Sequence, residues 1–589
     1  MEKKVKVRFP LLNKSIEMPE DSKISDACNA IGLPLNLVCG GKGKCKKCAV
    51  NIQVDHTIKS VLSCQTNVTE GLQILLKHEY IQAQILTESI LKDIHFNPSL
   101  SLKHLPPESL KTEMAGNDWD TIQKALGLSL HKPALGIIQK LSNIFHHPDG
   151  ITCILHNNIL VDVMPGRREK LFALAVDIGT TSVVGYLYDM KTLVLVGIRS
   201  RLNKQTQIGG DVISRIDYSI HKPDGLDRLH SLATETVNEI INNLCDDYQI
   251  DKNSIYQATF CGNSTMQHLF LKINPEYLGK IPFSSTAHQE ISTTASELNI
   301  NINPYGHITF LPLLGGFVGA DTTAVLTTIP DDNKNRLAID LGTNGEIAVG
   351  KGTLYRVAST ACGPALEGAG LEGGMWGTTG AIERFYIIDG RVSYKVIGDV
   401  KPKGICGSGI IDIISELLAN DIITDRGALR NPEQMANADL SKRIIPWDKS
   451  KAFVVCFEDE TDTGKPIVVT QIDIRHIQLA KGAIITGCRI LIEKSGLTLE
   501  DIDEILVAGA FGNYIDIRNA QSIGMIPHRP GLSVRPIGNA AGTGCQMHML
   551  SREKQGFCHE IAENVIHIEL AADPDFSTQY IMNTSFRAF

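Results

Sequence analysis

The chain has 589 residues, 43% of them apolar and 21% charged, which is enough material for several packed cores and excludes wholesale disorder. The net charge of −8 argues against a general nucleic-acid-binding protein, because such a protein needs a basic surface for phosphate contacts. We expect three to four domains, a cytoplasmic location and no membrane partner, because the sequence contains neither a signal-peptide pattern nor an apolar run of bilayer length.

The N-terminal part, residues 1–82, predicts a small independent domain around four cysteines. Apolar and polar residues alternate at its start, as in a β-strand, and a short helical pattern follows. The predicted elements are a strand at residues 5–9, a helix at 24–31, and strands at 49–54 and 72–76.

Residues 83–165 give a weaker pattern, with a Pro-Pro pair and intermittent apolar residues. We expect a linker there that merges into a small helical or mixed segment. The pattern becomes regular after residue 165, where continuous apolar strands at 171–176 and 183–188 flank the turn Asp177-Ile-Gly-Thr-Thr-Ser182.

The same arrangement recurs about 163 residues later, where strands at 337–339 and 347–349 flank the turn Asp340-Leu-Gly-Thr-Asn-Gly-Glu346. This recurrence indicates an internal duplication. Helical patterns follow each copy, and strands that alternate with helices predict mixed or parallel sheets covered by helices. We therefore predict a first lobe at residues 166–332 and a second lobe at 333–589.

Four cysteines of the N-terminal domain have a spacing typical of metal ligands. Five residues separate Cys39 from Cys45, two more precede Cys48, and fifteen precede Cys64. Three glycines before Cys45 allow backbone amides to turn towards bridging sulfides, and the second Cys-x-x-Cys pair of a zinc ribbon is missing, so iron–sulfur ligation is favoured over zinc. For Cys28 we expect a buried helix thiol, with a substitute ligand as the alternative.

These residues resemble the adrenodoxin-like [2Fe-2S] ferredoxins, which have a β-grasp fold and the same three-plus-one arrangement of cysteines. The resemblance implies that Cys39, Cys45, Cys48 and Cys64 hold a [2Fe-2S] cluster.

The duplicated turns have the composition of phosphate-binding loops. Each follows an apolar strand and supplies glycine, small hydroxyls and backbone N–H groups that can cradle phosphates, while its Asp can hold a Mg²⁺-bound water. Glycine-rich turns at 404–409 and 507–513 can approach the same nucleotide. The predicted nucleotide-binding residues are Gly179, Thr180, Thr181, Ser182, Gly342, Thr343, Asn344, Gly345, Gly407, Ser408, Gly409, Gly509, Ala510, Phe511 and Gly512.

This set resembles the actin/Hsp70/hexokinase superfamily, in which two duplicated lobes close over ATP and Mg²⁺. The resemblance implies that segments 260–264 and 315–321 are hinge or nucleotide-contact elements. The candidate catalytic carboxylates are Asp177, Asp340, Asp321 and Glu346. Glu346 and Glu367 are candidates to orient a water molecule, with a structural carboxylate as the alternative for each.

The whole chain resembles the reductive activators of corrinoid-dependent methyltransferases and corrinoid iron–sulfur proteins. The motifs that carry the match are CGGKG at 39–43, DVISRI at 211–216, GNSTM at 262–266, GPALEG at 363–368, GICGSG at 404–409 and GNAAGTG at 538–544. The resemblance implies a multidomain fold of the α+β and α/β classes, with a β-grasp ferredoxin, a linker and duplicated actin/sugar-kinase-like ATPase lobes. It also implies a homodimer.

The function implied by this resemblance is ATP-dependent electron transfer to the inactive cob(II)amide of a corrinoid protein, which regenerates cob(I)amide for methyl transfer. The partners would be that corrinoid protein and an upstream low-potential electron donor. Three alternatives remain open: an electron donor to another low-potential acceptor, such as a radical dehydratase; a sugar kinase or chaperone-like ATPase with an added ferredoxin domain; and a redox-sensing scaffold.

Overall fold

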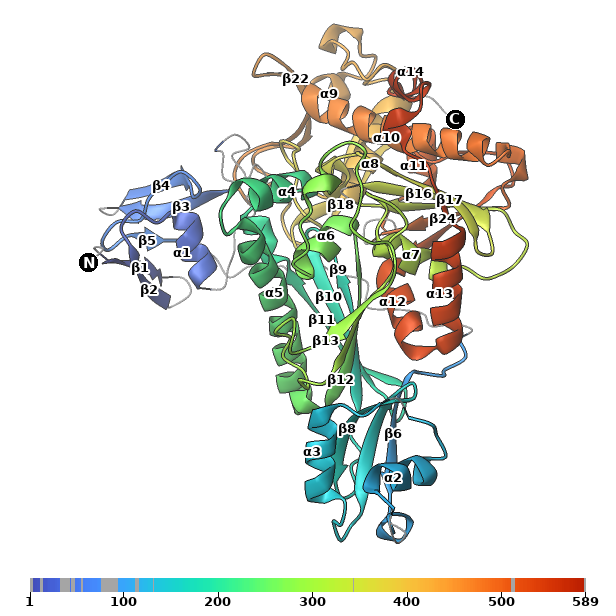
Figure 1. Ribbon diagram of the computed structural model, residues 1–589. Helices are drawn as coiled ribbons and strands as arrows, with labels where there is room; N and C mark the ends of the chain where they lie inside the picture. Colours follow the sequence, from blue (N-terminus) through green and yellow to red (C-terminus); the bar gives the residue numbers. More distant parts are fainter. Residues whose placement is uncertain are drawn as a thin grey trace.

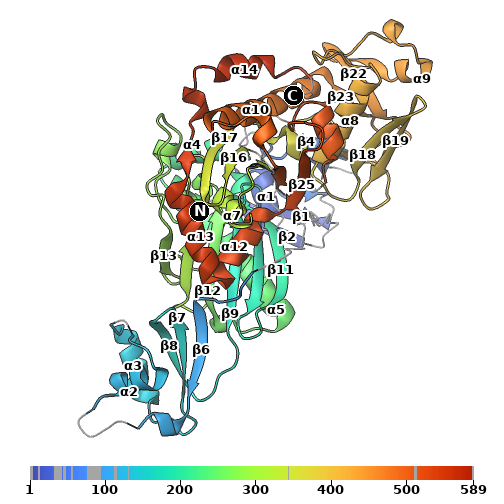
Figure 2. The same ribbon diagram turned by 90° about the vertical axis from the view of Figure 1, so that its right-hand side faces the viewer.

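The computed structural model describes residues 4–10, 14–31, 43, 48–54, 57–75, 94–111, 116–130, 132–342, 344–509 and 514–586. Four units follow one another along the chain: an N-terminal domain, a small second domain and two lobes (Figure 1). In both views the second domain projects from the end of the first lobe that lies away from the second lobe (Figures 1 and 2).

In its described residues the N-terminal domain has a five-stranded mixed sheet and one helix, an arrangement consistent with a β-grasp fold. Strand β1 pairs antiparallel with β2 and parallel with β5, and alternate β1 residues Val5, Val7 and Phe9 form the core with α1. The elements are β1 (Lys4–Phe9), β2 (Lys14–Pro19), α1 (Ile24–Ala30), β3 (Ala49–Val54), β4 (Thr57–Leu62) and β5 (Gln73–Ile74).

The segment that we expected to be a linker merging into a small helical or mixed unit forms, from residue 100, a compact domain with its own core. Three antiparallel strands in the order β6-β7-β8 pack against two helices through Ile122, Leu141, Phe145 and Leu155. The elements are β6 (Leu100–Leu105), a 3-10 turn (Pro107–Ser109), α2 (Asp118–Leu126), α3 (Leu135–Ile144), β7 (Ile151–His156) and β8 (Ile159–Pro165).

The first lobe is a six-stranded sheet in the order β11-β10-β9-β12-β14-β13, with the long helix α5 packed on β10 and β11. Its elements are β9 (Phe172–Ile178), β10 (Ser182–Asp189), β11 (Val194–Leu202), α4 (Val212–His221), α5 (Gly225–Tyr248), β12 (Ile255–Gly262), α6 (Ser264–Phe270), β13 (Ile291–Thr294), β14 (His307–Phe310) and α7 (Ala320–Thr327), with 3-10 turns at Lys204–Gln207, Lys252–Ser254 and Glu276–Leu278.

The second lobe has a six-stranded sheet in the order β25-β24-β15-β16-β17-β26 and two additional three-stranded sheets. Its strands are β15 (Arg336–Leu341), β16 (Gly345–Lys351), β17 (Leu354–Thr360), β18 (Ala381–Ile388), β19 (Arg391–Val396), β20 (Gly404–Ile405), β21 (Ile444–Trp447), β22 (Ser450–Cys456), β23 (Ile467–Thr470), β24 (Glu504–Ala508), β25 (Ser533–Gly538) and β26 (Ile566–His567). Its helices are α8 (Gly407–Ala419), α9 (Ala438–Ser441), α10 (Gln471–Lys494), α11 (Ile517–Ser522), α12 (Ala540–Leu550), α13 (Arg552–Asn564) and α14 (Phe576–Met582), with 3-10 turns at Pro364–Glu367, Pro432–Gln434, Leu499–Asp501 and Leu570–Ala572.

The two lobes repeat one strand arrangement. In the first, β9, β10 and β11 form an antiparallel meander and β12 lies parallel to β9 on its other side. In the second, β15, β16 and β17 form the same meander and β24 lies parallel to β15. The internal duplication predicted from the two Asp-x-Gly-Thr turns is therefore confirmed at the level of topology.

Helices α12 and α13 follow the last long strand of the second lobe but pack on the first lobe. Helix α12 contacts α7, β9 and β12, and α13 contacts α7 of the first lobe and also β17 of the second lobe. Cys545, Met549 and Leu550 of α12 belong to the core of the first lobe. The chain thus crosses back, and the start of α12 lies at the junction between the lobes.

Candidate nucleotide and iron–sulfur sites

A cavity of about 340 Å³ lies between the two lobes and is lined by both duplicated turns. Thr181 of the first turn approaches Glu367 of the second lobe, with 3.5 Å between hydroxyl and carboxylate oxygens. The predicted residues that line this cavity are Asp177, Gly179, Thr180, Thr181, Ser182, Asp321, Asp340, Gly342, Asn344, Glu346, Glu367, Gly407, Ser408 and Gly509. The geometry therefore brings residues far apart in the chain to one place.

Two predicted nucleotide-binding glycines do not line the cavity and instead allow close packing. A Cβ at Gly345 would lie 2.8 Å from the Thr360 hydroxyl, and one at Gly409 would lie 2.1 Å from the Ile382 carbonyl oxygen. Four other predicted residues, Thr343, Ala510, Phe511 and Gly512, lie outside the described residues.

The first turn is held by its own backbone and by side chains from three other elements. The Gly179 amide donates to the Ser182 carbonyl oxygen at 2.9 Å, and a Cβ at Gly179 would lie 2.6 Å from that oxygen. Asn203 donates to the Gly179 carbonyl oxygen at 2.9 Å, and Asn263 donates to the Thr180 hydroxyl at 2.9 Å. These hydrogen bonds hold the turn in one shape.

Arg215, which sequence reasoning did not assign to the site, braces the same turn from helix α4. Its fully buried guanidinium donates to the Thr180 carbonyl oxygen at 2.5 Å, to the Gly209 carbonyl oxygen at 2.9 Å and to Gln205 at 3.0 Å. The available signal was its position in the motif DVISRI, but nothing in that motif shows what it contacts.

The second turn meets the glycine-rich turn that follows β24. Gly509 has φ of +101°, and a Cβ there would lie 2.5 Å from the Leu341 carbonyl oxygen and 2.9 Å from Asp340 Oδ1. Only glycine combines this backbone conformation with such a close approach to Asp340.

The two segments predicted as hinge or nucleotide-contact elements touch each other. The Ser264 hydroxyl donates to the Gly315 carbonyl oxygen at 3.1 Å, and a Cβ at Gly319 would lie 2.4 Å from Asn263 Cα. Asn263 and Asp321 line the cavity, so each segment contributes one polar side chain to it.

Four carboxyl groups line the cavity together, and of these Glu346 is buried while Asp177, Asp321 and Asp340 are partly buried. Burial raises the pKa of Asp177 to about 7, with a contribution from the neighbouring Asp321. Burial also raises the pKa of Asp340 to about 7, helped by Asp321 and then Asp177, and that of Asp321 to about 6. Burial, with Asp321 and Asp340, raises the pKa of Glu346 well above its ordinary value. A cluster of hard oxygen ligands that raise one another's pKa fits a divalent cation such as Mg²⁺.

Several lining residues were missed by sequence reasoning. Trp376 and Tyr514 supply aromatic surface, and Asn539 from the start of α12 lies beside the carboxyl cluster. Arg201 is the single basic side chain among the described lining residues. Asn539 lies in the motif GNAAGTG, but that motif does not show that its side chain enters the cavity, which only tertiary folding decides.

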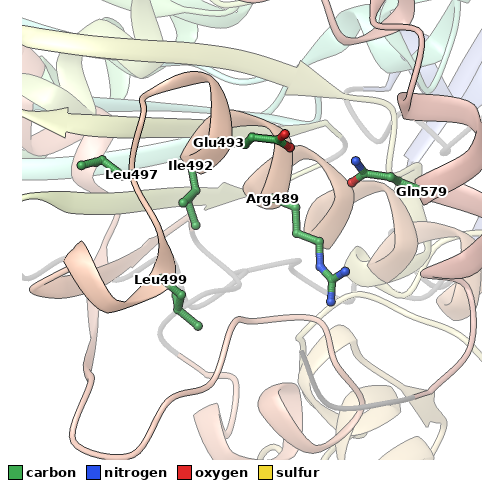
Figure 3. Close-up of a pocket in the computed structure, with 6 residues that line it drawn as sticks. All are labelled: Arg489, Ile492, Glu493, Leu497, Leu499 and Gln579. Carbon is green, nitrogen blue, oxygen red and sulfur yellow. The ribbon is translucent and has the colours of Figure 1, made fainter.

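A second cavity, of about 470 Å³, lies on the second lobe at the end of α10 (Figure 3). Arg489, Ile492 and Glu493 of α10 line it together with residues of the following loop and Gln579 of α14. It contains none of the predicted nucleotide-binding residues, so the cavity between the lobes is the candidate nucleotide site.

The structure describes two of the four predicted cluster ligands, and it brings these two together. The Sγ atoms of Cys48 and Cys64 are 3.1 Å apart, and both residues are buried. Cys39 and Cys45 lie outside the described residues. Cys28 instead lies on α1 and is buried in the core with Val5 and Phe9, as expected of a buried helix thiol.

These features together define a class of protein, a [2Fe-2S] ferredoxin domain joined to duplicated lobes of the actin and sugar-kinase type. Family models agree: the 2Fe-2S iron-sulfur cluster binding domain matches residues 12–69, the RACo middle region matches 172–330, and the C-terminal domain of RACo, an ASKHA domain, matches 334–588.

Individual relatives identify the family. The chain is 46% identical to the corrinoid activation enzyme RamQ of Eubacterium limosum, over 99% of each chain. It is 24% identical to the [Co(II) methylated amine-specific corrinoid protein] reductase of Methanosarcina barkeri, over 71% of this chain and 77% of that protein. A solved structure of a reductive activator for corrinoid,iron-sulfur protein matches with a TM-score of 0.76 and 30% identity, covering 99% of this chain and 98% of the other. The protein belongs to the family of reductive activators of corrinoid proteins.

The fold class and the family predicted from the sequence are thereby confirmed, and the protein is a corrinoid activation enzyme with a ferredoxin-type [2Fe-2S] domain. Among the described residues, no helix combines the length and the apolar character needed to cross a bilayer. The predicted domain limits and site residues stay predictions.

Proposed function

We propose that the protein transfers one low-potential electron from its [2Fe-2S] cluster to the cob(II)amide of a corrinoid protein, and that ATP bound between the lobes drives this transfer. The observation that carries the proposal is the cavity between the lobes, which is lined by two duplicated turns and four carboxyl groups in a chain that also carries a ferredoxin domain.

Cys39, Cys45, Cys48 and Cys64 would hold the cluster, which supplies a single electron at low potential. The Cys48 and Cys64 sulfurs lie 3.1 Å apart, so both would be placed to hold the cluster. Their burial excludes water from that side of the cluster.

The duplicated turns would bind the phosphates of ATP from opposite sides. Thr180 and Thr181 of the first turn and Gly342 and Asn344 of the second line the cavity from opposite sides, and Arg201 adds a positive charge near the phosphates. Trp376 and Tyr514 offer apolar and aromatic surface for the adenine ring. Asp177, Asp321 and Asp340 would hold Mg²⁺, which neutralises phosphate charge during hydrolysis.

ATP must be hydrolysed and not only bound if uphill electron transfer is to be repeated. A ligand can shift an equilibrium only by its differential affinity for two states, so a bound nucleotide that never changes cannot drive many turnovers. Glu346 and Glu367 line the cavity and are the candidates to orient the attacking water. The names of the relatives support the corrinoid acceptor over a radical dehydratase, a sugar substrate or a sensing role. We also propose a homodimer and an upstream low-potential electron donor.

The test is an anaerobic assay of cob(II) to cob(I) conversion on a corrinoid protein, with a chemical reductant and with ATP, ADP or no nucleotide. We expect sustained conversion only with ATP, and none in Cys64→Ala whatever the nucleotide. Conversion at the same rate with ADP or without nucleotide would contradict the proposed role of ATP.

A further inference from the structure

A second cluster of ligand-type side chains lies outside the nucleotide cavity. Glu290 Oε2 lies 2.9 Å from His548 Nε2 and 3.0 Å from His559 Nε2, and the three ligand atoms all lie within 4.8 Å of one another. The three residues come from three elements: Glu290 directly precedes β13, His548 lies on α12 and His559 on α13. We call this group the His–Glu–His cluster.

The three side chains of the cluster differ in how much of their surface is exposed to solvent. The His548 side chain is 3% exposed, Glu290 24% and His559 47%. His548 Nδ1 is buried without a hydrogen-bond partner, so the one polar contact of this side chain points into the cluster. A buried imidazole directed at a carboxylate and a second imidazole forms a site that is closed on one side and open to solvent on the other.

The composition and the spacing of the cluster fit a divalent transition-metal ion. Two imidazole nitrogens and one carboxylate oxygen are the donor set that binds zinc in sites that keep a fourth position for water or substrate. A tetrahedral ion with ligand bonds of about 2.0–2.1 Å separates its ligand atoms by about 3.3 Å. The Oε2–Nε2 distances of 2.9 and 3.0 Å therefore need to open by a few tenths of an ångström, and the two Nε2 atoms, which lie within 4.8 Å of each other, need to be about 3.3 Å apart.

The location links the cluster to the nucleotide cavity and to the small second domain. Asn539 caps α12 and lines the cavity, while His548 lies near the other end of the same helix. At the turn between α12 and α13, the Asn97 amide donates to the Leu550 carbonyl oxygen and the Arg552 amide donates to the Asn97 carbonyl oxygen, each at 3.0 Å. The cluster thus lies at the corner where the second domain attaches to the first lobe.

We propose that Glu290, His548 and His559 bind a divalent transition-metal ion of the zinc class, which fixes α12 and α13 to the segment before β13. The ion is separate from the [2Fe-2S] cluster and from the Mg²⁺ of the nucleotide site. A fourth coordination position faces solvent on the side of His559.

The test is zinc binding by the full-length protein. The iron–sulfur cluster is assembled first so that it occupies its cysteine thiols, and excess Mg²⁺ is added so that it occupies the carboxyl groups between the lobes. Bound zinc is counted after dialysis, and affinity is measured by calorimetry. Glu290→Gln keeps the shape of the side chain, and His559→Ala removes a half-exposed ring, so both should fold. His95→Ala is the matched control, because exposed His95 pairs with Glu553 of the same helix α13 outside the cluster.

We expect wild type and His95→Ala to bind one equivalent of zinc and to unfold at a higher temperature when it is added. In Glu290→Gln and His559→Ala the affinity should fall by more than the roughly 10–100-fold that loss of an outer-shell partner costs. Zinc binding that is absent from wild type, or equal in all four proteins, would overturn the proposal.

Discussion

Asp177 and Asp340 occupy equivalent positions in the two lobes. Asp177 is the penultimate residue of β9, and Asp340 is the penultimate residue of β15. Both have a raised pKa, because burial disfavours their charged form and the neighbouring carboxyl groups disfavour it further. Groups that disfavour one another's charge in the free protein gain most from a bound cation. These residues are therefore where metal and nucleotide binding should be most sensitive to substitution.

Asp340→Asn should reduce ATP-dependent corrinoid reduction on the order of 100-fold, because it removes a carboxylate that organises Mg²⁺ and the phosphates. The visible spectrum of the iron–sulfur cluster should not change. Rates are compared in the cob(II) assay at saturating corrinoid protein. A variant with wild-type rate would show that Asp340 does not hold the metal.

The raised pKa values predict a pH dependence of stability and of metal affinity. Asp177 and Asp340 lose their protons near pH 4 in the unfolded chain but only near pH 7 in the folded one, so the free protein loses stability as pH rises between these values. Mg²⁺ needs the ionised groups, so its affinity should increase from pH 6 to pH 8, by about tenfold for each carboxyl group.

Thermal unfolding with and without Mg²⁺, measured across that range for wild type and Asp177→Asn, checks both expectations. The fall of the melting temperature with pH should be shallower in the variant. The expected sign would be contradicted if the melting temperature of the free wild-type protein rose from pH 5 to pH 7 and that of Asp177→Asn rose equally.

Among the elements, the turns around the cavity depend on glycines whose surroundings leave no room for a side chain. Gly509 combines a positive φ with a carbonyl oxygen 2.5 Å from the position of a Cβ, which would also lie 2.9 Å from Asp340 Oδ1. Gly556 offers a contrast, because it lies inside helix α13 and a Cβ there would have no neighbouring atom within 4 Å.

Gly509→Ala should displace the turn against Asp340 and weaken ATP binding at least tenfold, whereas Gly556→Ala should stabilise the protein by about 0.5–1 kcal/mol through helix propensity. Calorimetric ATP titration and thermal unfolding measure the two effects. Equal ATP affinity in Gly509→Ala and Gly556→Ala would mean that the turn is not part of the nucleotide site.

Local patterns predicted the elements that carry the site, and failed where long-range packing decides. The strands before Asp177 and Asp340 were predicted because an apolar run that ends at an Asp-x-Gly-Thr turn is a local signal. The sheet of the second domain was not predicted, because its strands are short and their common core forms only when they pack against α2 and α3. Gly345 and Gly409 were assigned to the nucleotide although each lies against a neighbouring element, which no turn composition reveals.

For the whole molecule, the return of α12 and α13 to the first lobe ties the lobes together. Asn539 at the start of α12 donates to the Tyr186 hydroxyl in the first lobe at 3.2 Å, and Tyr188 donates to Gln546 at 2.7 Å. A change at the nucleotide cavity can thus reach the first lobe and the attached second domain through one helix. The sequence showed the motif GNAAGTG but gave no reason to place the following helix on the first lobe.

The central claim is that electron transfer from the ferredoxin domain to the corrinoid requires the nucleotide lobes to turn over ATP. The most direct measurement mixes the pre-reduced protein with a cob(II) corrinoid protein in a single anaerobic turnover and records cluster absorbance, corrinoid absorbance and phosphate release together. The account predicts that cluster oxidation, cob(I) formation and phosphate release occur together with ATP, and that the first two stop without it. Full cob(I) formation from the reduced cluster in the absence of ATP would contradict the account.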